Sequence, residues 1–233
     1  MQIIKQHKEL SDFIKGKKVL HLNSLGKDSI VCLEWLTAFA RVDVVSLYLD
    51  FISYHPGDEA YFEYLKARYR SVNFIKFPNP IELSNLCSGV YQTPIEILTY
   101  SNNLEYNDFD FDKVVKELKI KYDCDYICIG SSKYENFARA MKFHKRGILI
   151  GDEIFPLGMM TKEQVISIIK ASGMKLHPCY KTTPGTYDHP SHYKMRSGFV
   201  VSPEYKKKMY EVYPMLRLDE YRWEKLLTKD KKK

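Results

Sequence analysis

The sequence predicts an α/β protein with a mainly parallel five-stranded sheet, helices on both faces and a C-terminal helical extension. Two observations carry this prediction. Short apolar, β-prone runs alternate with segments of helical periodicity, and Gly, Pro or polar turns separate them. One run is apolar at nearly every position, which is typical of a strand covered on both faces of a parallel sheet.

The first strand is expected at Lys18–Asn23, followed by a polar turn and a helix. In that helix Val31, Trp35 and Ala38 share one face. The second strand, Asp43–Leu49, is the continuous apolar run. These elements predict a β-α-β unit, which joins parallel strands.

A second helix is expected at Pro56–Arg70, because a proline and the acidic residues Asp58 and Glu59 stand near its start. Val72–Phe77 is the third predicted strand, and prolines end it. Between Ile81 and Asn107 the signal is weak, so short helices and a long connection are expected there.

The second half of the sequence continues the alternation: a helix at Asp110–Lys121, a strand at Asp125–Gly130, an irregular fifth strand within Gly147–Leu157 and a helix at Thr161–Ala171. The periodicity stops after His177 and returns in two late helices, Pro203–Val212 and Pro214–Leu227. We expect residues 1–175 to form one domain, and residues 176–233 to form an extension with a basic tail.

The composition is that of an ordinary soluble globular protein, with 233 residues of which 45% are hydrophobic and 14% aromatic. No stretch approaches the roughly 20 apolar residues that a membrane-spanning helix needs. Residues 1–18 carry no apolar core with a cleavage site, so no secretory signal and no membrane association are expected.

The cysteines are scattered and form no C-x-x-C pair: Cys32, Cys87, Cys124, Cys128 and Cys179. This spacing argues against a disulfide framework, a zinc site and an iron–sulfur cluster. Free cysteines fit a cytoplasmic protein in a reducing compartment.

The chain has a net charge of +7, and part of the excess lies in a C-terminal tail and at Lys206–Lys208. Lys142, Lys145 and Arg146 form another basic group. A solvated surface, a nucleic-acid contact and a polyphosphate ligand would each suit this charge.

The most informative stretch is Asn23-Ser-Leu-Gly-Lys-Asp-Ser29, which follows the first strand and opens a helix. Gly26 permits close backbone approach, and the first N–H groups of a helix have no partner within the helix. Together with the helix dipole they form a site for an anion.

Four polar side chains of this stretch suit a polyphosphate ligand. The hydroxyls of Ser24 and Ser29 can donate hydrogen bonds, and Lys27 brings a positive charge. Asp28 is a natural ligand for the Mg²⁺ ion that accompanies a polyphosphate. A helix cap would explain one of these residues but not all four together with Gly26, so we predict a phosphate site.

The stretch resembles the S-G-G-x-D-S motif of the PP-loop superfamily, which binds the pyrophosphate of ATP. It departs from that motif at Leu25, which stands where the first glycine would be. The change is mild if the backbone of Leu25 adopts an ordinary conformation. The sequence contains neither a Walker A motif nor a G-x-G-x-x-G motif.

Further segments resemble the phosphoadenylyl-sulfate (PAPS) reductase-like branch of that superfamily. They are Tyr48–Asp50, Pro56–Phe62, Gly130–Arg139, Ile154–Thr161 and His177–Tyr180. The resemblance implies the adenine nucleotide alpha hydrolase-like fold, with residues 1–175 as the nucleotide-binding domain.

The resemblance also implies further contacts to the nucleotide. Leu49 and Asp50 would lie near the adenine at the end of the second strand, and Asp50 is alternatively a helix cap. After the fourth strand Gly130 and Arg139 stand at matching positions, and Lys133 stands near the position of the first arginine. The two cations among them are either ligand contacts or surface charges.

Two cysteines that many members of this branch carry are missing. Arg196–Pro203 keeps the frame of the R-x-G-C-x-x-C-P motif but has Phe199 and Ser202 at the cysteine positions, and no cysteine follows Cys179. Phe and Ser cannot replace a thiolate. A thiol-dependent PAPS reductase is therefore excluded, and we interpret Cys179 as a packing residue.

We therefore expect a protein that binds ATP with Mg²⁺ and cleaves it at the α-phosphate with release of pyrophosphate, as an ATP pyrophosphatase or adenylyltransferase does. Lys27 and Asp28 would carry the chemistry, with Asp28 as the metal ligand, and the sequence does not identify the acceptor. Two alternatives stay open: a sulfonucleotide-binding relative without the thiol, and a non-catalytic nucleotide-binding partner in nucleic-acid modification. A homodimer is compatible with the sequence.

Overall fold

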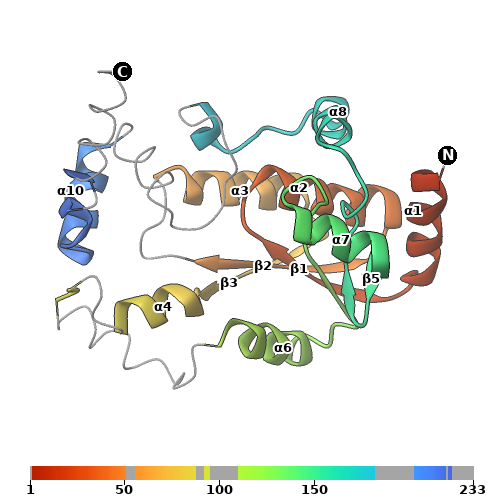
Figure 1. Cartoon of the computed structure of the whole chain (residues 1–233), viewed down its shortest axis with the longest axis horizontal. Helices are drawn as coiled ribbons and strands as arrows, with labels where there is room; N and C mark the ends of the chain where they lie inside the picture. Colours follow the sequence, from red (N-terminus) through yellow and green to blue (C-terminus); the bar gives the residue numbers. More distant parts are fainter. Residues whose placement is uncertain are drawn as a thin grey trace.

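A computed structural model of the chain describes residues 2–50, 56–87, 92–94, 110–181, 202–218 and 220–221 (Figure 1). Within these residues a six-stranded sheet has the order β3-β2-β1-β4-β6-β5. Its strands are β1 (Lys18–Asn23), β2 (Asp43–Asp50), β3 (Asn73–Pro78), β4 (Tyr126–Cys128), β5 (Leu149–Ile150) and β6 (Glu153–Ile154). All neighbours are parallel except β5 and β6. The predicted α/β class with a mainly parallel sheet is confirmed.

The sheet has six strands rather than the predicted five because the segment Gly147–Leu157 folds as a hairpin. Its two short antiparallel strands, β5 and β6, pair Leu149 with Ile154. Gly151 in the turn between them has a φ of +63°, a conformation that glycine adopts at little cost. Periodicity alone could not separate two strands this short.

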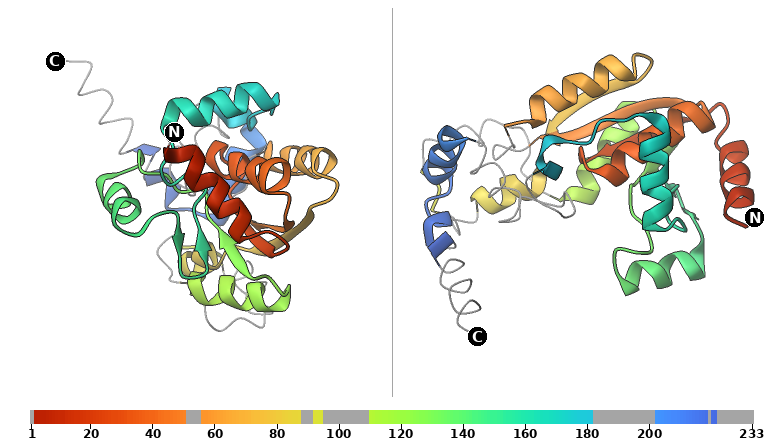
Figure 2. Two further views of the ribbon diagram at one scale, coloured as in Figure 1. Left: turned by 90° about the vertical axis from the view of Figure 1, so that its right-hand side faces the viewer. Right: turned by 90° about the horizontal axis from the view of Figure 1, so that it is seen from above.

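Helices cover both faces of the sheet, as predicted (Figures 1 and 2). The helices of the described residues are α1 (Gln2–Phe13), α2 (Lys27–Glu34), the π-helix η1 (Trp35–Ala40), α3 (Asp58–Arg68), α4 (Pro80–Cys87), α6 (Phe111–Lys121), α7 (Phe137–Arg146), α8 (Lys162–Ser172), the 3₁₀-helix η2 (Pro178–Lys181) and α10 (Pro203–Val212). None of them is long and apolar enough to cross a membrane.

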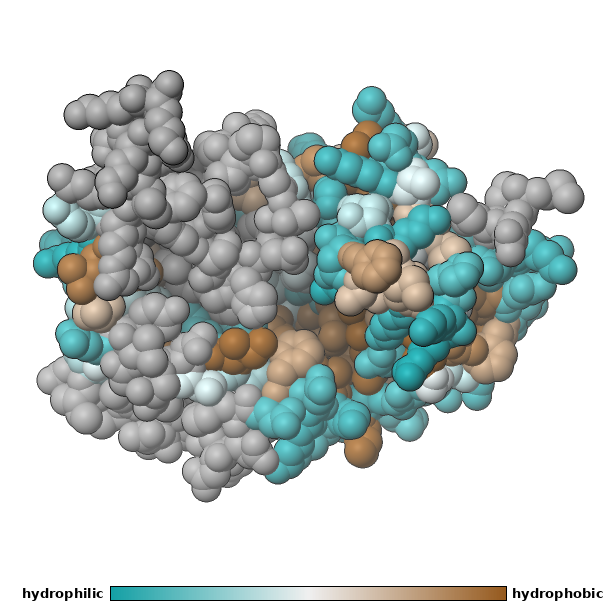
Figure 3. All heavy atoms as spheres, viewed as in Figure 1, coloured by the Kyte–Doolittle hydropathy of each residue, from teal (hydrophilic) through white to brown (hydrophobic). Residues whose placement is uncertain are grey.

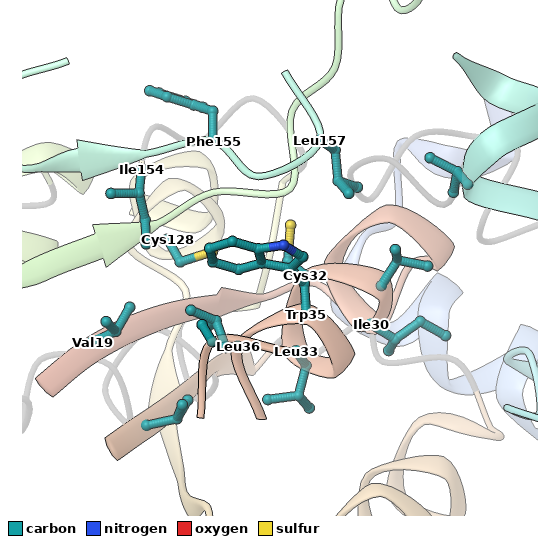
Figure 4. Packing of buried hydrophobic residues seen from close by; sticks show 14 of the residues in the cluster. Val19, Ile30, Cys32, Leu33, Trp35, Leu36, Cys128, Ile154, Phe155 and Leu157 are labelled. Carbon is teal, nitrogen blue, oxygen red and sulfur yellow. The ribbon is translucent and has the colours of Figure 1, made fainter. Parts of the chain in front are cut away.

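Two apolar clusters hold the helices to the sheet. The larger contains residues of α1, α2, α3 and α8, and Figure 4 shows Trp35 within it, beside Cys128 of β4 and Ile154 of β6. The smaller lies on the opposite face, where Leu20 of β1 and Val45 of β2 pack with α6. Because Leu20 pairs with Val45 in the sheet, both side chains point to the same face.

The helix after β1 changes its geometry at η1. Val31 and Trp35 are buried, but Ala38, which the periodicity placed on the same face, is exposed, while Ala40 is buried. A π-helix closes i→i+5 hydrogen bonds and so turns less per residue than an α-helix, which shifts the buried face. Arg41 then ends the helix with a φ of +55°.

Helix α10 packs on α4, away from the centre of the sheet (Figures 1 and 2). Leu86 of α4 and Met209 of α10 belong to one buried cluster, and the Tyr213 hydroxyl donates a hydrogen bond to Glu82. The predicted helix Pro203–Val212 is observed, and half of the second late helix, Pro214–Leu227, lies outside the described residues. The division of the chain at residue 175 stays a prediction.

Candidate functional site

The stretch Asn23–Ser29 lies at the carboxyl end of β1, in the middle of the sheet. The chain continues from β1 to β2 on one side and reaches β4 on the other, so the strand order reverses next to β1. Ligands of open α/β sheets bind in the crevice that forms at such a reversal. The fold therefore places this loop where a ligand site is expected.

Short polar side chains hold the loop in shape. Asn23 Oδ1 accepts a hydrogen bond from Leu25 N (2.9 Å), and Ser24 Oγ accepts one from Gly26 N (3.3 Å). Ser29 Oγ accepts one from Ser24 N (3.2 Å), and the Ser29 side chain is buried. The hydroxyls of both serines, predicted as phosphate donors, make hydrogen bonds within the loop in this structure.

Leu25 does not have an ordinary backbone conformation. Its φ is +60°, and its side chain is fully buried in the larger apolar cluster. This left-handed region costs a residue with a Cβ atom about 1–2 kcal/mol. The replacement of glycine is therefore not mild for the backbone, and burial of the side chain offsets the strain.

A buried polar network supports the loop from below. His21 Nδ1 lies 3.2 Å from Ser46 Oγ, and its Nε2 lies 2.9 Å from the carbonyl oxygen of Ser29. The carbonyl can only accept, so Nε2 carries the proton and donates. Asn23 Nδ2 donates to Ser46 Oγ (3.1 Å), which completes the network. Burial lowers the pKa of His21 to about 4, so the imidazole is neutral.

Sequence reasoning missed this network, although a signal for it exists. His21 and Ser46 are polar residues inside apolar strands, and the parallel register pairs them directly. Two polar residues at matched positions of neighbouring buried strands indicate a hydrogen bond, because an unpaired buried polar group is costly.

Lys27 and Asp28 lie together with Tyr134, which follows β4. Lys27 Nζ forms an ion pair with Asp28 Oδ2 and lies 3.5 Å from Tyr134 Oη, while the Tyr134 hydroxyl donates to Asp28 Oδ1. The Lys27 and Asp28 side chains are only 11% and 16% exposed. Burial, reinforced by Asp28, raises the pKa of Tyr134, so its hydroxyl keeps its proton.

The first backbone N–H of α2 points to another tyrosine. Gly26 is the N-cap residue of α2 and has no side chain that could cap the helix. Instead, Lys27 N donates a hydrogen bond to Tyr180 Oη (2.9 Å). Tyr180 belongs to η2, and neighbouring Cys179 N donates to His177 Nδ1 (3.2 Å). A helix N–H that donates outward is the element of an anion site.

A buried pair anchors the segment that carries Tyr180. His177 Nε2 lies 3.0 Å from Asp58 Oδ1 in α3, and both side chains are almost fully buried. Tyr48 of β2 donates to the other oxygen of Asp58 (2.8 Å), and the ring of Tyr61 packs edge-on against His177. These contacts join β2, α3 and the segment that leads to Tyr180.

Gly130 touches the start of α2. A Cβ atom on Gly130 would lie 2.9 Å from Ser29 N and 3.0 Å from Ser29 Cα, closer than side-chain carbons pack. The absence of a side chain therefore lets the end of β4 approach the loop. A contact of Gly130 with a nucleotide stays a prediction.

The two predicted cations after β4 are not seen on the loop. Arg139 pairs with Glu135, whose carboxylate also accepts from Ser132 N (2.6 Å). Lys133 N donates to Gly158 O (3.1 Å). Among the described residues, neither side chain forms a hydrogen bond or ion pair with residues 23–29, so a ligand role for them stays a prediction.

Leu49 and Asp50 end β2, the strand next to β1, on the same edge of the sheet as the loop. The Asp50 carbonyl oxygen accepts from Asn79 N (2.9 Å).

Ser202 caps α10 by accepting from Tyr205 N (3.1 Å). The rest of the Arg196–Pro203 motif, except Pro203 itself, lies outside the described residues.

The predicted basic group on α7 is partly neutralised. Lys142 Nζ lies 3.6 Å from Glu153, whereas Lys145 and Arg146 are exposed at the end of the helix. Phe137 is 80% exposed on the same helix. The face drawn in Figure 3 is mixed, with hydrophobic residues among hydrophilic ones.

The described cysteines are buried, and none of them forms a disulfide bond: Cys32, Cys124, Cys128 and Cys179. Burial raises the pKa of Cys32 and brings that of Cys124 to about 11, which disfavours reactive thiolates. No group of three or more His, Cys, Asp or Glu residues that could hold a metal ion occurs in the described part of the chain.

No protein-family model and no curated protein matches the sequence, but solved structures are similar in fold. U34-tRNA thiolase NcsA from Methanococcus maripaludis is 18% identical with a TM-score of 0.48, over 95% of this chain and 80% of NcsA. NH3-dependent NAD synthetase from Campylobacter jejuni is 13% identical with a TM-score of 0.47, over 74% of each chain. PAPS reductase from Candida auris is 10% identical with a TM-score of 0.47, over 77% of this chain and 90% of the reductase.

The prediction that this chain has no iron–sulfur cluster is contradicted, because the structure of NcsA, to which the chain is similar, includes a [4Fe-4S] cluster. The expectation rested on the absence of a C-x-x-C pair. Cysteines that are far apart in the sequence can be brought together by the fold to bind a cluster, without forming a C-x-x-C pair. The spacing of cysteines is therefore not enough to exclude an iron–sulfur cluster.

The chain has an α/β architecture consistent with the adenine nucleotide alpha hydrolase-like fold that the resemblance implies, and its likeness to the three solved structures is one of fold alone.

Proposed function

We propose that this protein binds ATP with Mg²⁺ at the start of α2 and cleaves it at the α-phosphate, releasing pyrophosphate. One observation carries the proposal. The backbone N–H of Lys27, which donates to the Tyr180 hydroxyl in this structure, lies at the reversal point of the sheet with the Lys27 ammonium group and the Asp28 carboxylate, and a phosphate would take the place of that hydroxyl.

The leaving pyrophosphate would bind to the start of α2. The N–H groups and dipole of the helix favour an anion there, and the Lys27 amine adds a full positive charge. Both groups would stabilise the negative charge that develops on the pyrophosphate as the bond between the α-phosphorus and the bridging oxygen breaks. An acceptor oxygen would take the adenylyl group.

The donor set suits Mg²⁺ bound together with a polyphosphate. Magnesium in such sites takes one or two carboxylates and completes its shell with phosphate oxygens and water. Asp28 supplies one carboxylate, and this explains why no larger ligand cluster is needed in the described residues. The ion would neutralise charge on the leaving pyrophosphate.

The adenine would lie along the carboxyl edge of β1 and β2, near Leu49 and Asp50. Gly130 would keep the end of β4 close to the phosphates, since it packs against Ser29.

We propose a cytoplasmic location.

The test measures pyrophosphate released from ATP in the presence of Mg²⁺ and a small-molecule cell extract that supplies acceptors. Lys27→Ala and Asp28→Ala should each lower release at least about 10²-fold, the usual loss when one group that stabilises developing charge is removed. Lys66→Ala is the control, because Lys66 pairs with Glu63 on the exposed side of α3.

Unchanged pyrophosphate release in both loop variants would disprove the site. Calorimetric binding of ATP and PAPS to the wild-type protein separates this proposal from its alternative. Tight binding of PAPS without binding of ATP would favour a sulfonucleotide-binding protein.

A further inference from the structure

We propose that Tyr134 is the positioning residue of the metal ligand Asp28. Its hydroxyl holds one carboxylate oxygen in place, so that the other oxygen can pass from Lys27 to Mg²⁺ when a polyphosphate binds. This inference rests on the proposed function and assigns a role to a residue that the sequence motif does not contain.

The two oxygens of Asp28 have different partners. Oδ1 accepts the hydrogen bond from Tyr134, and Oδ2 pairs with Lys27. The carboxylate is 16% exposed, so water cannot readily replace a partner that leaves. If Oδ2 loses Lys27, the hydrogen bond from Tyr134 to Oδ1 therefore still holds the Asp28 side chain in place.

Lys27 is the partner that a ligand would draw away. Lys27 is the first residue of α2, the end of the helix where phosphates would bind, and its ammonium group pairs with Asp28 in the absence of a ligand. A polyphosphate carries more negative charge than one carboxylate and so competes for Lys27. Asp28 Oδ2 would then be left without its cation, and it would be available to hold a divalent ion that balances the negative charge.

Tyr134 stays in place during this exchange because it is neutral and the backbone around it is tied down. Ser132 N donates to Glu135 Oε1 (2.6 Å), and Lys133 N donates to Gly158 O (3.1 Å). The Tyr134 side chain packs against the larger apolar cluster. The hydrogen-bonded turn at residues 132–135 therefore holds the Tyr134 hydroxyl next to Asp28.

A hydrogen bond to a metal-binding carboxylate fixes its orientation, and losing such a bond typically lowers metal affinity about 10–100-fold. Tyr134→Phe removes the hydroxyl and keeps the ring. We expect it to raise the Mg²⁺ concentration for half-maximal ATP binding by about 10–100-fold. ATP binding in EDTA, which depends on α2 and Lys27, should stay unchanged.

The experiment titrates ATP into the protein by calorimetry, in EDTA and at a series of Mg²⁺ concentrations. Tyr126→Phe is the matched control, because this half-buried phenol on β4 packs on Phe13, away from the loop. Thermal unfolding confirms that both variants are folded.

Two results would overturn the role of Tyr134 while leaving the proposed function intact. One is an unchanged Mg²⁺ requirement in Tyr134→Phe. The other is an equal loss of ATP affinity with and without Mg²⁺, which would mean that the hydroxyl supports the loop as a whole. Failure of the wild-type protein to bind ATP under any condition would instead remove the proposed function, and this inference with it.

Discussion

At Leu25 a buried side chain and a strained backbone act in opposite directions. The φ of +60° favours glycine, but the fully buried side chain favours leucine. Deleting a buried leucine side chain costs about 2–5 kcal/mol, more than the roughly 1–2 kcal/mol that the left-handed conformation costs. At this position the free energy gained by burying the leucine side chain therefore exceeds the cost of the left-handed backbone.

This balance predicts an unusual order of stability for two variants. Leu25→Ala loses the side chain and keeps the strain, whereas Leu25→Gly loses both. Allowing for the greater freedom of glycine in the unfolded chain, Leu25→Gly should be the more stable by about 0.5–1 kcal/mol, with both below wild type. Urea unfolding of the three proteins measures this, and an alanine variant at least as stable as the glycine variant would contradict it.

Among elements, the start of α2 and the end of β4 meet without room for a side chain. Gly130→Ala would bring a Cβ atom to 2.9 Å from the Ser29 backbone, which has no flexible end to move. We expect a stability loss of about 1–3 kcal/mol and a lower ATP affinity, since the helix start must shift.

Gly16→Ala is the control for this prediction. Gly16 lies between α1 and β1, before the strand that the loop follows, and its φ of +74° strains a residue with a Cβ atom without crowding a neighbour. Calorimetry and urea unfolding should show a stability loss in both variants and weaker ATP binding in Gly130→Ala alone. Equal ATP affinity in the two variants would show that the contact at Ser29 does not shape the site.

Local signals made several elements predictable. Helix α6 begins at Phe111, after Asp110, whose carboxylate accepts from two N–H groups of the first turn. Helix α8 begins after Thr161, which forms a capping box with Gln164. Such caps are readable because all their partners lie within a few residues.

The side chains that complete the candidate site were not predictable in this way. Tyr134 and Asp28 are 106 residues apart, and Tyr180 is 153 residues from Lys27. Only the path of the chain through the sheet brings them together. The loop motif itself was recognisable because its glycine, charges and hydroxyls are contiguous.

For the whole molecule, the buried His21 couples global stability to pH. Its pKa is about 4 in the folded protein and about 6.5 when unfolded, so below pH 6.5 the unfolded chain binds the proton more readily. The stability that the neutral imidazole contributes is complete above pH 6.5 and is lost as the pH falls towards 4. At pH 5 the loss should be about 2 kcal/mol.

Urea unfolding of wild type and His21→Gln between pH 7.5 and 5 measures this contribution. Glutamine does not titrate, so the variant should lack about 2 kcal/mol of the wild-type decline, whatever its stability at pH 7.5. The remaining decline belongs to other groups, including His7, whose pKa burial also lowers. Identical slopes in the two proteins would contradict the role given to His21.

The distance along the chain between the loop and its supports has a consequence for protein synthesis. At about 5–20 residues per second, Tyr180 leaves the ribosome roughly 8–30 s after Lys27. Early in this interval the nascent chain carries the complete loop sequence without Gly130 and Tyr134, and throughout the interval it lacks Tyr180. The nucleotide proposed above would therefore stabilise the domain only late in its synthesis, and the earliest steps of folding would proceed without it.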